Sequence, residues 1–465
     1  MSTDLCRQLT PQLDSLLDAH AAQPLRIALA YSGGLDSSVL LALLVEWAEQ
    51  RSVQLFAFHI QHGISPHAET WHQHCAQICQ QKQVRFASQH LQLANWQDTG
   101  LEEAARMQRY AALGQLCQQH QITLLLTAHH LDDQAETVLM HLLRGSGVAG
   151  LGGMDSVNHA PSLLGSPEVR IARPLLSITR EALEAYALEY QVAHIEDESN
   201  LDPRYTRNAL RHQVMPHLAA NFPQFQARLA RTAQHMQAAQ RLLQELAELD
   251  LQNCADGAQL LLPAVLALNP ERRDNLMRHW LALHDKRMPS ASWLREMWQQ
   301  LQTEDVEAHP CISHPDCQIR LYRQRIYLTP RYDAERLEAQ AQHFVWQGEA
   351  ELRFDAFHGS LQFVPVAADE AGELGLACTY LREQTLEIHY RRGGEQLKLA
   401  ANRATRSLKQ HYQSQHIPTW QRTFLPLISC QQKLLFAPGL GLDCYFTQMQ
   451  ASESARVRLV WRADA

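Results

Sequence analysis

Ser32-Gly33-Gly34-Leu35-Asp36-Ser37-Ser38 lies between an apolar run, Ile27 to Tyr31, and a helical run, Val39 to Trp47. This order of strand, glycine turn and helix is typical of an anion-binding loop. Two adjacent glycines let the backbone adopt positive φ and approach an anion, and the amides at the N-terminus of the helix carry its positive dipole end. The hydroxyls of Ser37 and Ser38 would be further donors. An ordinary Gly-Gly turn with a serine cap is the alternative.

The loop lacks the lysine of G-x-x-x-x-G-K-[ST] and the spacing of G-x-G-x-x-G, so neither of those two phosphate-binding motifs fits. It resembles instead the pyrophosphatase loop, S-G-G-x-D-S. Enzymes with that loop cleave ATP between its α and β phosphates and pass AMP to an acceptor. The resemblance implies that Asp36 lies nearest Mg²⁺. It also implies that ATP is bound by Ser32, Gly33, Gly34, Leu35, Asp36, Ser37 and Ser38.

Strand and helix signals alternate over the first two hundred residues, which predicts an α/β domain with a doubly wound parallel sheet. The apolar runs that predict strands are Ile27–Tyr31, Gln54–Ile60, Arg85–Leu91 and Ile122–Ala128. The remaining signals predict a mostly helical middle domain and a small α+β domain at the C-terminal end. The predicted boundaries are 1–220 for the catalytic domain, 221–330 for the middle domain, 331–350 for a connecting segment and 351–465 for the C-terminal domain.

A second polar cluster, His129 to Thr137, follows another predicted strand. Because ligands of such sheets bind at the carboxyl ends of the strands, we expect it to lie near the glycine loop. If a helix begins near Asp132, then Asp133 and Glu136 share one face and can direct two carboxylates into one cleft. Such a pair would hold magnesium or the ammonium of an amine substrate. An acidic first turn that complements the helix dipole is the alternative. His129 would contact phosphate, move a proton or be a capped structural histidine.

Composition argues against a membrane, secreted or disulfide-rich protein. The chain has 465 residues, a net charge of −8 and 46% hydrophobic residues, and it has no leader-like start or membrane-length apolar segment. We expect a cytoplasmic protein. Its ten cysteines are scattered, and Cys75 and Cys79 are spaced C-x-x-x-C, so free thiols are favoured over a zinc or redox site.

A basic segment opposes this overall acidity near the C-terminal end, where seven cations lie between Arg391 and Arg422 against one acid, Glu395. Tyr412 and Trp420 are interleaved with these cations and would be stacking surfaces for exposed bases. A solvated basic face is the alternative. The cations that we regard as candidates for nucleotide or nucleic-acid contact are Arg391, Arg392, Arg403, Arg406 and Lys409.

Four blocks in order make the N-terminal region similar to the tRNA(Ile)-lysidine synthetase family, and the stretch from Tyr390 to Leu427 resembles the family's C-terminal domain. The blocks are Ser32–Ser38; Glu102–Tyr110; His129–Thr137 with its continuation to Met154; and Asp197–Asn200 with Arg207, Asn208 and Arg211.

The resemblance implies an ATP-dependent ligase that joins free lysine to C2 of the wobble cytidine in isoleucine tRNA of CAU anticodon, with Mg²⁺ at the phosphates. By position, Asp133 and Glu136 would bind the lysine amine, and His129 and Arg207 would face the phosphates or the adenylated base. Arg106 and Arg109 are candidates for nucleotide or tRNA contact. A homodimer is compatible with these features. The alternatives are another tRNA-modifying enzyme of the same ATP class, such as a thiolase, or a tRNA-binding scaffold without catalysis.

Overall fold

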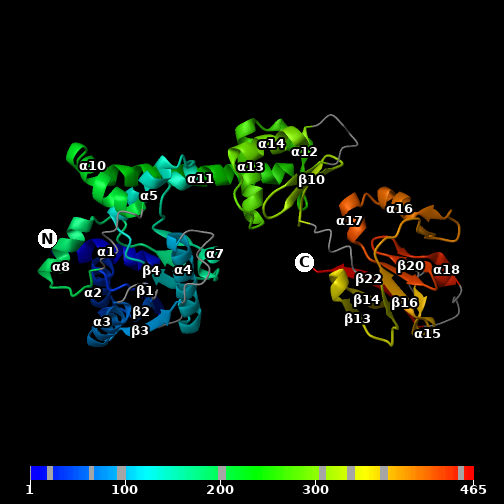
Figure 1. Cartoon of the computed structure of the whole chain (residues 1–465), viewed down its shortest axis with the longest axis horizontal. Coiled ribbons are helices and arrows are strands. Elements are labelled where there is room, and N and C mark those ends of the chain that lie inside the picture. Colours follow the sequence, from blue (N-terminus) through cyan, green and yellow to red (C-terminus); the bar gives the residue numbers. More distant parts are fainter. Residues whose placement is uncertain are drawn as a thin grey trace. The chain divides into compact units, whose positions relative to one another are not determined.

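The computed structural model describes residues 2–17, 25–61, 67–91, 101–196, 206–302, 310–331, 341–366, 375–448 and 455–464. The chain forms two compact units, Met1–Leu246 and Ala247–Ala465 (Figure 1). The finer domain boundaries drawn from the sequence stay a prediction.

A six-stranded sheet with the order β3-β2-β1-β4-β6-β5 is the centre of the first unit. Five strands are parallel, and β5 pairs antiparallel with β6. This confirms the predicted doubly wound parallel sheet, because four of its strands coincide with the four apolar runs. The strands are β1 (Leu25–Ala30), β2 (Val53–Gln61), β3 (Arg85–His90), β4 (Leu124–Leu126), β5 (Val157–His159) and β6 (Arg170–Ala172).

Helices cover both faces of this sheet. In β1, Ile27 and Leu29 pack into one core with α1, α2 and α8, whereas Ala28 packs into the other with α4. Alternate residues of a strand face opposite sides, so one apolar run supplies both cores. Figure 1 shows α2 and α4 on opposite sides of the strands. The helices are α1 (Ser2–Leu16), α2 (Leu35–Glu49), α3 (Ala68–Gln81), α4 (Leu101–His120), α5 (Leu131–Leu143) and α8 (Arg180–Glu189).

The last helices of the first unit pack against α5. Ala135 of α5 contacts a small core that contains Met215 and Phe225. This contact fixes the segment around Arg207 and Arg211 beside the acidic first turns of α5. The segments concerned are α6 (Val148–Leu151), α7 (Pro161–Leu164), α9 (Thr206–Ala209), a π-helical turn (Leu210–Val214), α10 (Met215–Asn221) and α11 (Phe225–Cys254), which continues into the second unit.

The second unit begins with three helices packed on a five-stranded antiparallel sheet of order β7-β8-β11-β10-β9. The predicted helical region therefore also carries a sheet. At the β10–β11 turn, Arg323 and Gln324 both have positive φ, which suits the twist of a tight hairpin. The elements are α12 (Leu262–Ala267), α13 (Pro270–Leu283), α14 (Ala291–Leu301), β7 (Ala255–Asp256), β8 (Gln259–Leu261), β9 (Cys311–Ser313), β10 (Gln318–Tyr322) and β11 (Arg325–Thr329).

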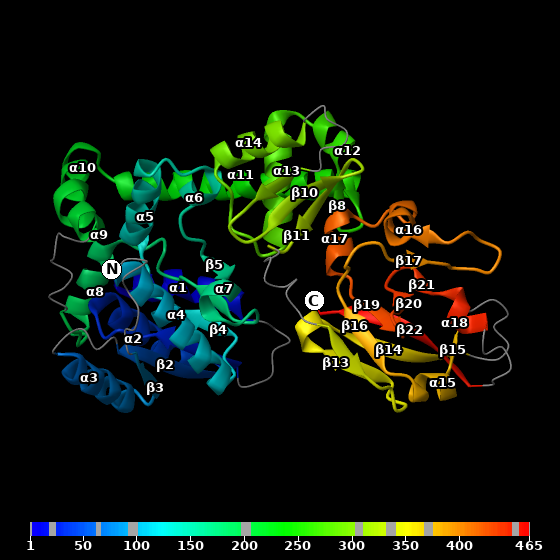
Figure 2. The same cartoon turned by 45° about the vertical axis from the view of Figure 1, so that its right-hand side comes forward.

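The C-terminal part is the expected α+β module, with two antiparallel sheets around a shared core (Figure 2). One sheet has the order β12-β16-β19-β20-β21 and the other β13-β14-β22-β15. Residues 332–340 of the predicted connecting segment lie outside the described residues. The strands are β12 (Gln342–Phe344), β13 (Glu351–Phe354), β14 (Gly359–Val366), β15 (Leu376–Ala377), β16 (Leu386–His389), β19 (Leu427–Cys430), β20 (Lys433–Ala437), β21 (Gly441–Leu442) and β22 (Arg456–Ala463).

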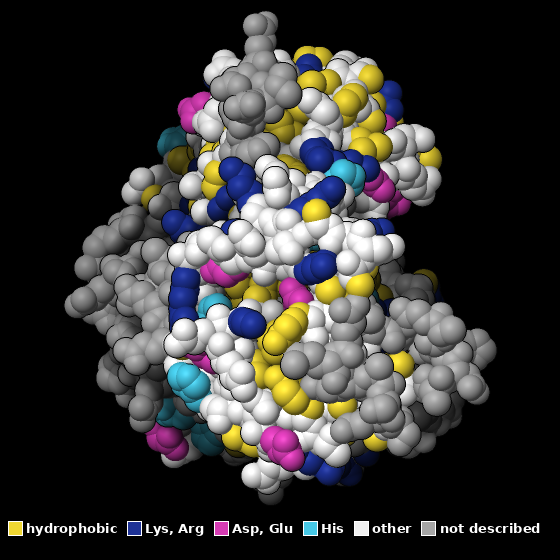
Figure 3. Space-filling view, turned by 90° about the vertical axis from the view of Figure 1, so that its right-hand side faces the viewer, with side chains coloured by type: hydrophobic (Ala, Val, Ile, Leu, Met, Phe, Trp, Pro, Cys, Tyr) yellow, Lys and Arg dark blue, Asp and Glu magenta, His cyan; other side chains and the backbone are white. Residues whose placement is uncertain are grey.

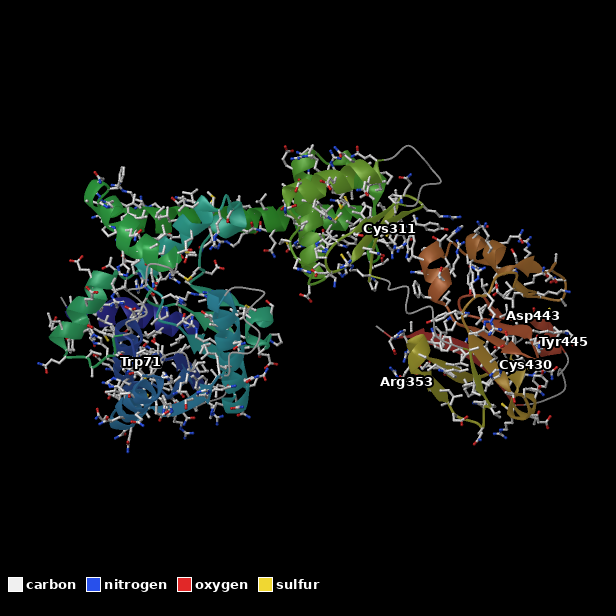
Figure 4. The ribbon with its side chains drawn as sticks, viewed as in Figure 1. Trp71, Cys311, Arg353, Cys430, Asp443 and Tyr445 are labelled. Carbon is white, nitrogen blue, oxygen red and sulfur yellow. The ribbon has the colours of Figure 1, made fainter. Side chains whose placement is uncertain are left out.

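Short helices and a two-stranded ribbon complete this module. Asp443, labelled in Figure 4, accepts hydrogen bonds from the backbone N–H of Lys398 at 2.8 Å and of Tyr445 at 2.9 Å. It thereby ties the basic segment to the edge of the larger sheet. The elements are β17 (Gln396–Leu397), β18 (Arg406–Ser407), α15 (Cys378–Glu383), α16 (Leu408–Ser414), α17 (Thr419–Phe424) and α18 (Cys444–Gln448).

Candidate active site

The glycine loop joins β1 to α2, as the sequence predicts, and is braced by its own serines. Gly33 has a φ of +84°. The hydroxyl of Ser38 donates to the Gly33 carbonyl at 3.1 Å, and that of Ser37 donates to the Gly34 carbonyl at 3.0 Å. These hydroxyls therefore fix the loop's shape, and the backbone amides at the start of α2 are its natural anion donors.

Gly33 also has no room for a side chain. A Cβ there would lie 2.7 Å from Cys75 Sγ and 2.8 Å from Ile195 Cδ1. For Gly33→Ala we expect a lower unfolding temperature, because left-handed backbone costs about 1–2 kcal/mol for a residue with a Cβ and overpacking adds about 1–3 kcal/mol. Gly34→Ala is the matched control, since Gly34 has a φ of −70° and its Cβ would meet only Ser32 Oγ at 3.5 Å. Equal thermal unfolding of the two variants would contradict the expectation.

Asp36, on the first turn of α2, is held by an arginine from a distant helix. Arg180 Nη1 lies 2.8 and 2.7 Å from the two carboxylate oxygens of Asp36. Arg180 is the first residue of α8, whose N-cap is Thr179. Burial raises the pKa of Asp36, and the charges of His130 and Arg180 oppose that rise. The pair fixes the carboxylate beside the loop.

His130, rather than its neighbour His129, lies at the centre of three aspartates. Its Nε2 is 3.3 Å from Asp133 and 3.8 Å from Asp36, and its Nδ1 is 3.6 Å from Asp132. Burial alone would lower the pKa of His130, but these carboxylates outweigh it and raise the pKa. A raised pKa favours the protonated imidazole. His130 thus lies between Asp36 of the glycine loop and the two aspartates in the first turn of α5.

Asp132 joins three helices. It accepts hydrogen bonds from the backbone N–H of Arg180 at 2.9 Å and from Gln226 Nε2 at 3.1 Å. Burial alone would raise its pKa, but contacts with His130, Arg180 and Gln226 more than offset this and lower the pKa to about 2.

The depressed pKa of Asp132 predicts a pH-dependent contribution to stability. Such a carboxyl stabilises the fold above its unfolded pKa of 3.8, and that contribution is lost as pH falls toward the folded value of about 2. We expect Asp132→Asn to lower the free energy of unfolding by on the order of 2 kcal/mol near neutrality and by progressively less below about pH 4. Urea unfolding of the first unit at pH 6, 4 and 3 measures this difference. A difference that grows as pH falls would contradict the assignment.

Asp133 and Glu136 share a face of α5, as the i, i+3 spacing predicts, and two arginines bind both of them. Arg207 Nη2 is 2.8 Å from Asp133 and its Nε is 2.7 Å from Glu136. Arg211 Nη2 is 3.1 Å from Asp133 and its Nε is 2.6 Å from Glu136. Burial alone would raise the pKa of Asp133, and the charges of His130 and Arg207 lower it below its ordinary value. Both carboxylates are therefore paired with the same two guanidiniums.

His129 and two arginines of α4 complete the site. His129 Nδ1 lies 2.9 Å from Thr127 Oγ1. Burial holds the pKa of His129 well below its ordinary value, with Asp133 opposing and the charges of Arg207 and Arg109 adding to the effect. The imidazole is therefore neutral near pH 7. The Arg106 and Arg109 guanidiniums lie 5.3 and 5.8 Å from the centre of the Tyr110 ring. Burial lowers the pKa of Arg109, and the charges of Arg106 and Arg207 lower it further.

The basic segment of the C-terminal domain is exposed only in part. Arg403, Arg406 and Lys409 are exposed, whereas Arg391 is half-buried beside Glu395, and Arg392 pairs with Glu387 at 2.6 Å. Figure 3 shows several Lys and Arg side chains across the upper half of this face, interspersed with neutral side chains.

The expectation that Tyr412 and Trp420 are stacking surfaces is wrong. Tyr412 is 0% exposed and packs with Leu408 and Leu427, and Trp420 is 5% exposed, edge-on to Tyr322. Leu408 and Tyr412 lie four residues apart on α16, so both side chains face the core.

Sequence reasoning missed several residues of this site, namely His130, Asp132, Arg180 and the pairing of Arg211. The sequence indicates Arg211 only as a member of the fourth block, without a partner or a role. The fourth block's Asp197–Asn200 lies outside the described residues, as do the side chains of Glu102 and Glu103.

The fold and the loop define an ATP-using enzyme of the PP-loop class, and the PP-loop domain model matches residues 5–218. Two further family models match, the "TilS substrate binding domain" at residues 260–327 and the "TilS substrate C-terminal domain" at 386–461. The chain belongs to the tRNA(Ile)-lysidine synthase family. It is 36% identical to the tRNA(Ile)-lysidine synthase of Ralstonia nicotianae, over 90% of this chain and 89% of that protein. It is 37% identical to that of Burkholderia pseudomallei (94% and 93%) and 37% identical to that of Salmonella heidelberg (94% and 97%).

Proposed function

We propose that this protein joins the ε-amine of free lysine to C2 of the wobble cytidine in isoleucine tRNA of CAU anticodon, with cleavage of ATP to AMP and pyrophosphate. One observation carries the proposal beyond family membership. A buried pair of carboxylates, Asp133 and Glu136, lies in the same hydrogen-bonded and charged network as Asp36 of the phosphate-binding loop, through His130. That arrangement suits an amine substrate presented to an activated phosphate ester.

The chemistry requires two steps, because the C2 carbonyl of cytosine is a poor electrophile and its oxygen a poor leaving group. In the first step the C2 oxygen attacks the α-phosphorus, an O–P bond forms, the α–β P–O bond breaks and pyrophosphate leaves. In the second step the lysine nitrogen attacks C2, the C2–O bond breaks and AMP leaves. Loop amides and arginines stabilise the charge that develops on the phosphate.

The lysine amine must lose a proton before it attacks, since its pKa in water is about 10.4. Asp133 and Glu136 would bind and orient the ammonium. His129, which burial keeps neutral near pH 7, contacts Thr127 Oγ1 and lies near the charges of Asp133 and Arg207. It would accept a proton or a hydrogen bond from the reacting groups.

Magnesium would be held by Asp36 together with phosphate oxygens. Within the described ranges no group of three or more His, Cys, Asp or Glu side chains is arranged as a metal site. Magnesium at nucleotides commonly uses one or two carboxylates plus phosphate and water, so a single Asp36 fits that use. The ion would supply neutralisation of the phosphate charge.

The tRNA body would contact the exposed cations of the C-terminal domain, Arg403, Arg406 and Lys409, together with Arg391 and Arg392. No helix among the described residues is long and apolar enough to cross a membrane. We place the reaction in the cytoplasm, where its tRNA substrate would be found, and keep a homodimer as a hypothesis for size measurement in solution.

The state of the paired cysteines on α3 disfavours the thiolase alternative, which needs reactive thiols near the ATP site. Cys75 and Cys79 are fully buried on α3, and burial raises the pKa of both thiols to about 12. None of the ten cysteines, all of which lie in the described residues, is in a disulfide.

The direct test is to incubate the protein with ATP, Mg²⁺, radiolabelled lysine and unmodified tRNA, and to follow both label in the tRNA and AMP. ATP-dependent labelling that disappears when the wobble cytidine is replaced supports the ligase. AMP without labelled tRNA would mean a different acceptor, and neither product would favour the scaffold.

A further inference from the structure

The carboxylates proposed to bind lysine have every oxygen engaged. Glu136 Oε1 accepts from Arg211 Nε at 2.6 Å, and Glu136 Oε2 accepts from Arg207 Nε at 2.7 Å and Arg211 Nη2 at 3.0 Å. Asp133 Oδ1 accepts from both guanidiniums, and its Oδ2 accepts from the backbone N–H of His130 at 3.0 Å. An incoming ammonium therefore has to replace an existing partner.

The guanidiniums also lie between these carboxylates and solvent. The side chain of Glu136 is 1% exposed and that of Asp133 12%, whereas those of Arg207 and Arg211 are 27% and 34% exposed. A protonated lysine approaching from solvent first meets two positive charges. Its entry is opposed both sterically and by like-charge repulsion.

The two arginines are built to act together. Arg207 lies on α9, and Arg211 lies four residues later in the π-helical turn Leu210–Val214. Both side chains point to the same two carboxylates, Asp133 and Glu136. Such turns are unusual in helices and are frequent at functional sites.

A phosphate group gives these arginines an alternative partner. Asp133, which both guanidiniums bind, lies 3.3 Å from His130 Nε2, and that nitrogen lies 3.8 Å from Asp36 of the loop. Both guanidiniums are thus linked through two side chains to the loop that would hold ATP. Guanidinium binds phosphate by paired hydrogen bonds at least as well as it binds carboxylate.

We propose that Arg207 and Arg211 occupy the lysine site of the nucleotide-free enzyme, and that the phosphates of bound ATP draw them away and so open the site. Lysine then binds after nucleotide. The amine is thereby kept out of an enzyme that holds no nucleotide with which to activate the base. This inference rests on the proposed function. Because each ligand favours the same open state, binding of either one strengthens binding of the other.

Calorimetric titration of the full-length protein with lysine tests the coupling, with and without the ATP analogue that has a methylene group between its α and β phosphates. We expect the analogue to tighten lysine binding by about 10- to 100-fold, which is the usual range for coupled sites. Arg211→Gln should bind lysine without the analogue nearly as well as the wild type does with it, and should gain little more when it is added. Arg231→Gln, an exposed arginine of α11, is the matched control and should keep the wild-type coupling.

Wild-type lysine affinity that does not depend on the analogue would overturn the inference, as would wild-type lysine binding that stays undetectable with the analogue present. Arg207→Gln is a second variant with the same expectation should Arg211→Gln fail to fold, which circular dichroism reports. Labelled-lysine transfer to tRNA is measured on the same wild-type preparation. Transfer without nucleotide-dependent lysine binding refutes only the inference, whereas absence of transfer by folded protein refutes the proposed function.

Discussion

Asp36→Asn should reduce lysidine formation by about 1000-fold, the loss typical of removing a main electrostatic group from a transition state. Asp36 lies at the first turn of α2, directly beside the phosphate-binding loop, and is the carboxylate best placed to hold Mg²⁺ there. The amide is the same size but cannot neutralise a cation. AMP release and labelled tRNA, measured under saturating ATP, should fall together.

The fold should tolerate this change, which makes the loss of activity interpretable. The partner of Asp36 is Arg180, whose side chain is 37% exposed and can return to water. We therefore expect unfolding to change by no more than about 1 kcal/mol, as is usual for pairs open to solvent. Gel-shift binding of tRNA should be retained. Wild-type AMP release by Asp36→Asn would exclude a direct role for the carboxylate.

Arg180→Gln tests whether Arg180 acts by positioning the Asp36 carboxylate or by contacting the metal and phosphate itself. Arg180 contacts Asp36 through its side chain and Asp132 through its backbone N–H. The substitution keeps the backbone contact and removes the side-chain contact with Asp36, together with an exposed pair with Glu184. We expect a smaller loss of AMP release than for Asp36→Asn, together with a higher Mg²⁺ requirement because the carboxylate is less fixed. An activity loss equal to that of Asp36→Asn would instead place Arg180 on the reacting groups.

The sequence predicted the parts of this site that local spacing determines. The glycine loop follows directly after a strand, and Asp133 and Glu136 are one helical turn apart, so both could be placed without a structure. The partners could not. Arg180 is 144 residues from Asp36, and only the packing of α8 beside α2 brings them together.

The error at Tyr412 and Trp420 has a different cause. Cations nearby made both aromatics look like base-stacking surfaces, but composition does not say which face of a helix points outward. The spacing of Leu408 and Tyr412 was the better signal, because aromatic and aliphatic residues four apart usually mark a buried face. The exposed Arg403, Arg406 and Lys409 remain the stronger candidates for RNA contact.

Glu136→Gln should destabilise the first unit strongly. Glu136 is 1% exposed and accepts three hydrogen bonds from two guanidiniums. Removing its charge leaves Arg207 and Arg211 sharing Asp133 alone, and breaking a buried pair in this way costs about 3–5 kcal/mol. With about 2–4 °C per kcal/mol for a unit of this size, the melting temperature should fall by roughly 10 °C.

Lysine transfer by Glu136→Gln should fall by at least about 100-fold, mainly through a higher KM for lysine, because the ammonium loses one of its two carboxylates. Glu184→Gln is a suitable control, since Glu184 pairs with Arg180 at an exposed position and should change the melting temperature by under about 2 °C. The double variant Glu136→Gln with Arg211→Gln distinguishes the two effects. If the unbalanced charge causes the instability, the second substitution should restore part of the melting temperature without restoring lysine transfer. A double variant less stable than either single one would mean that the pairs act through packing rather than charge.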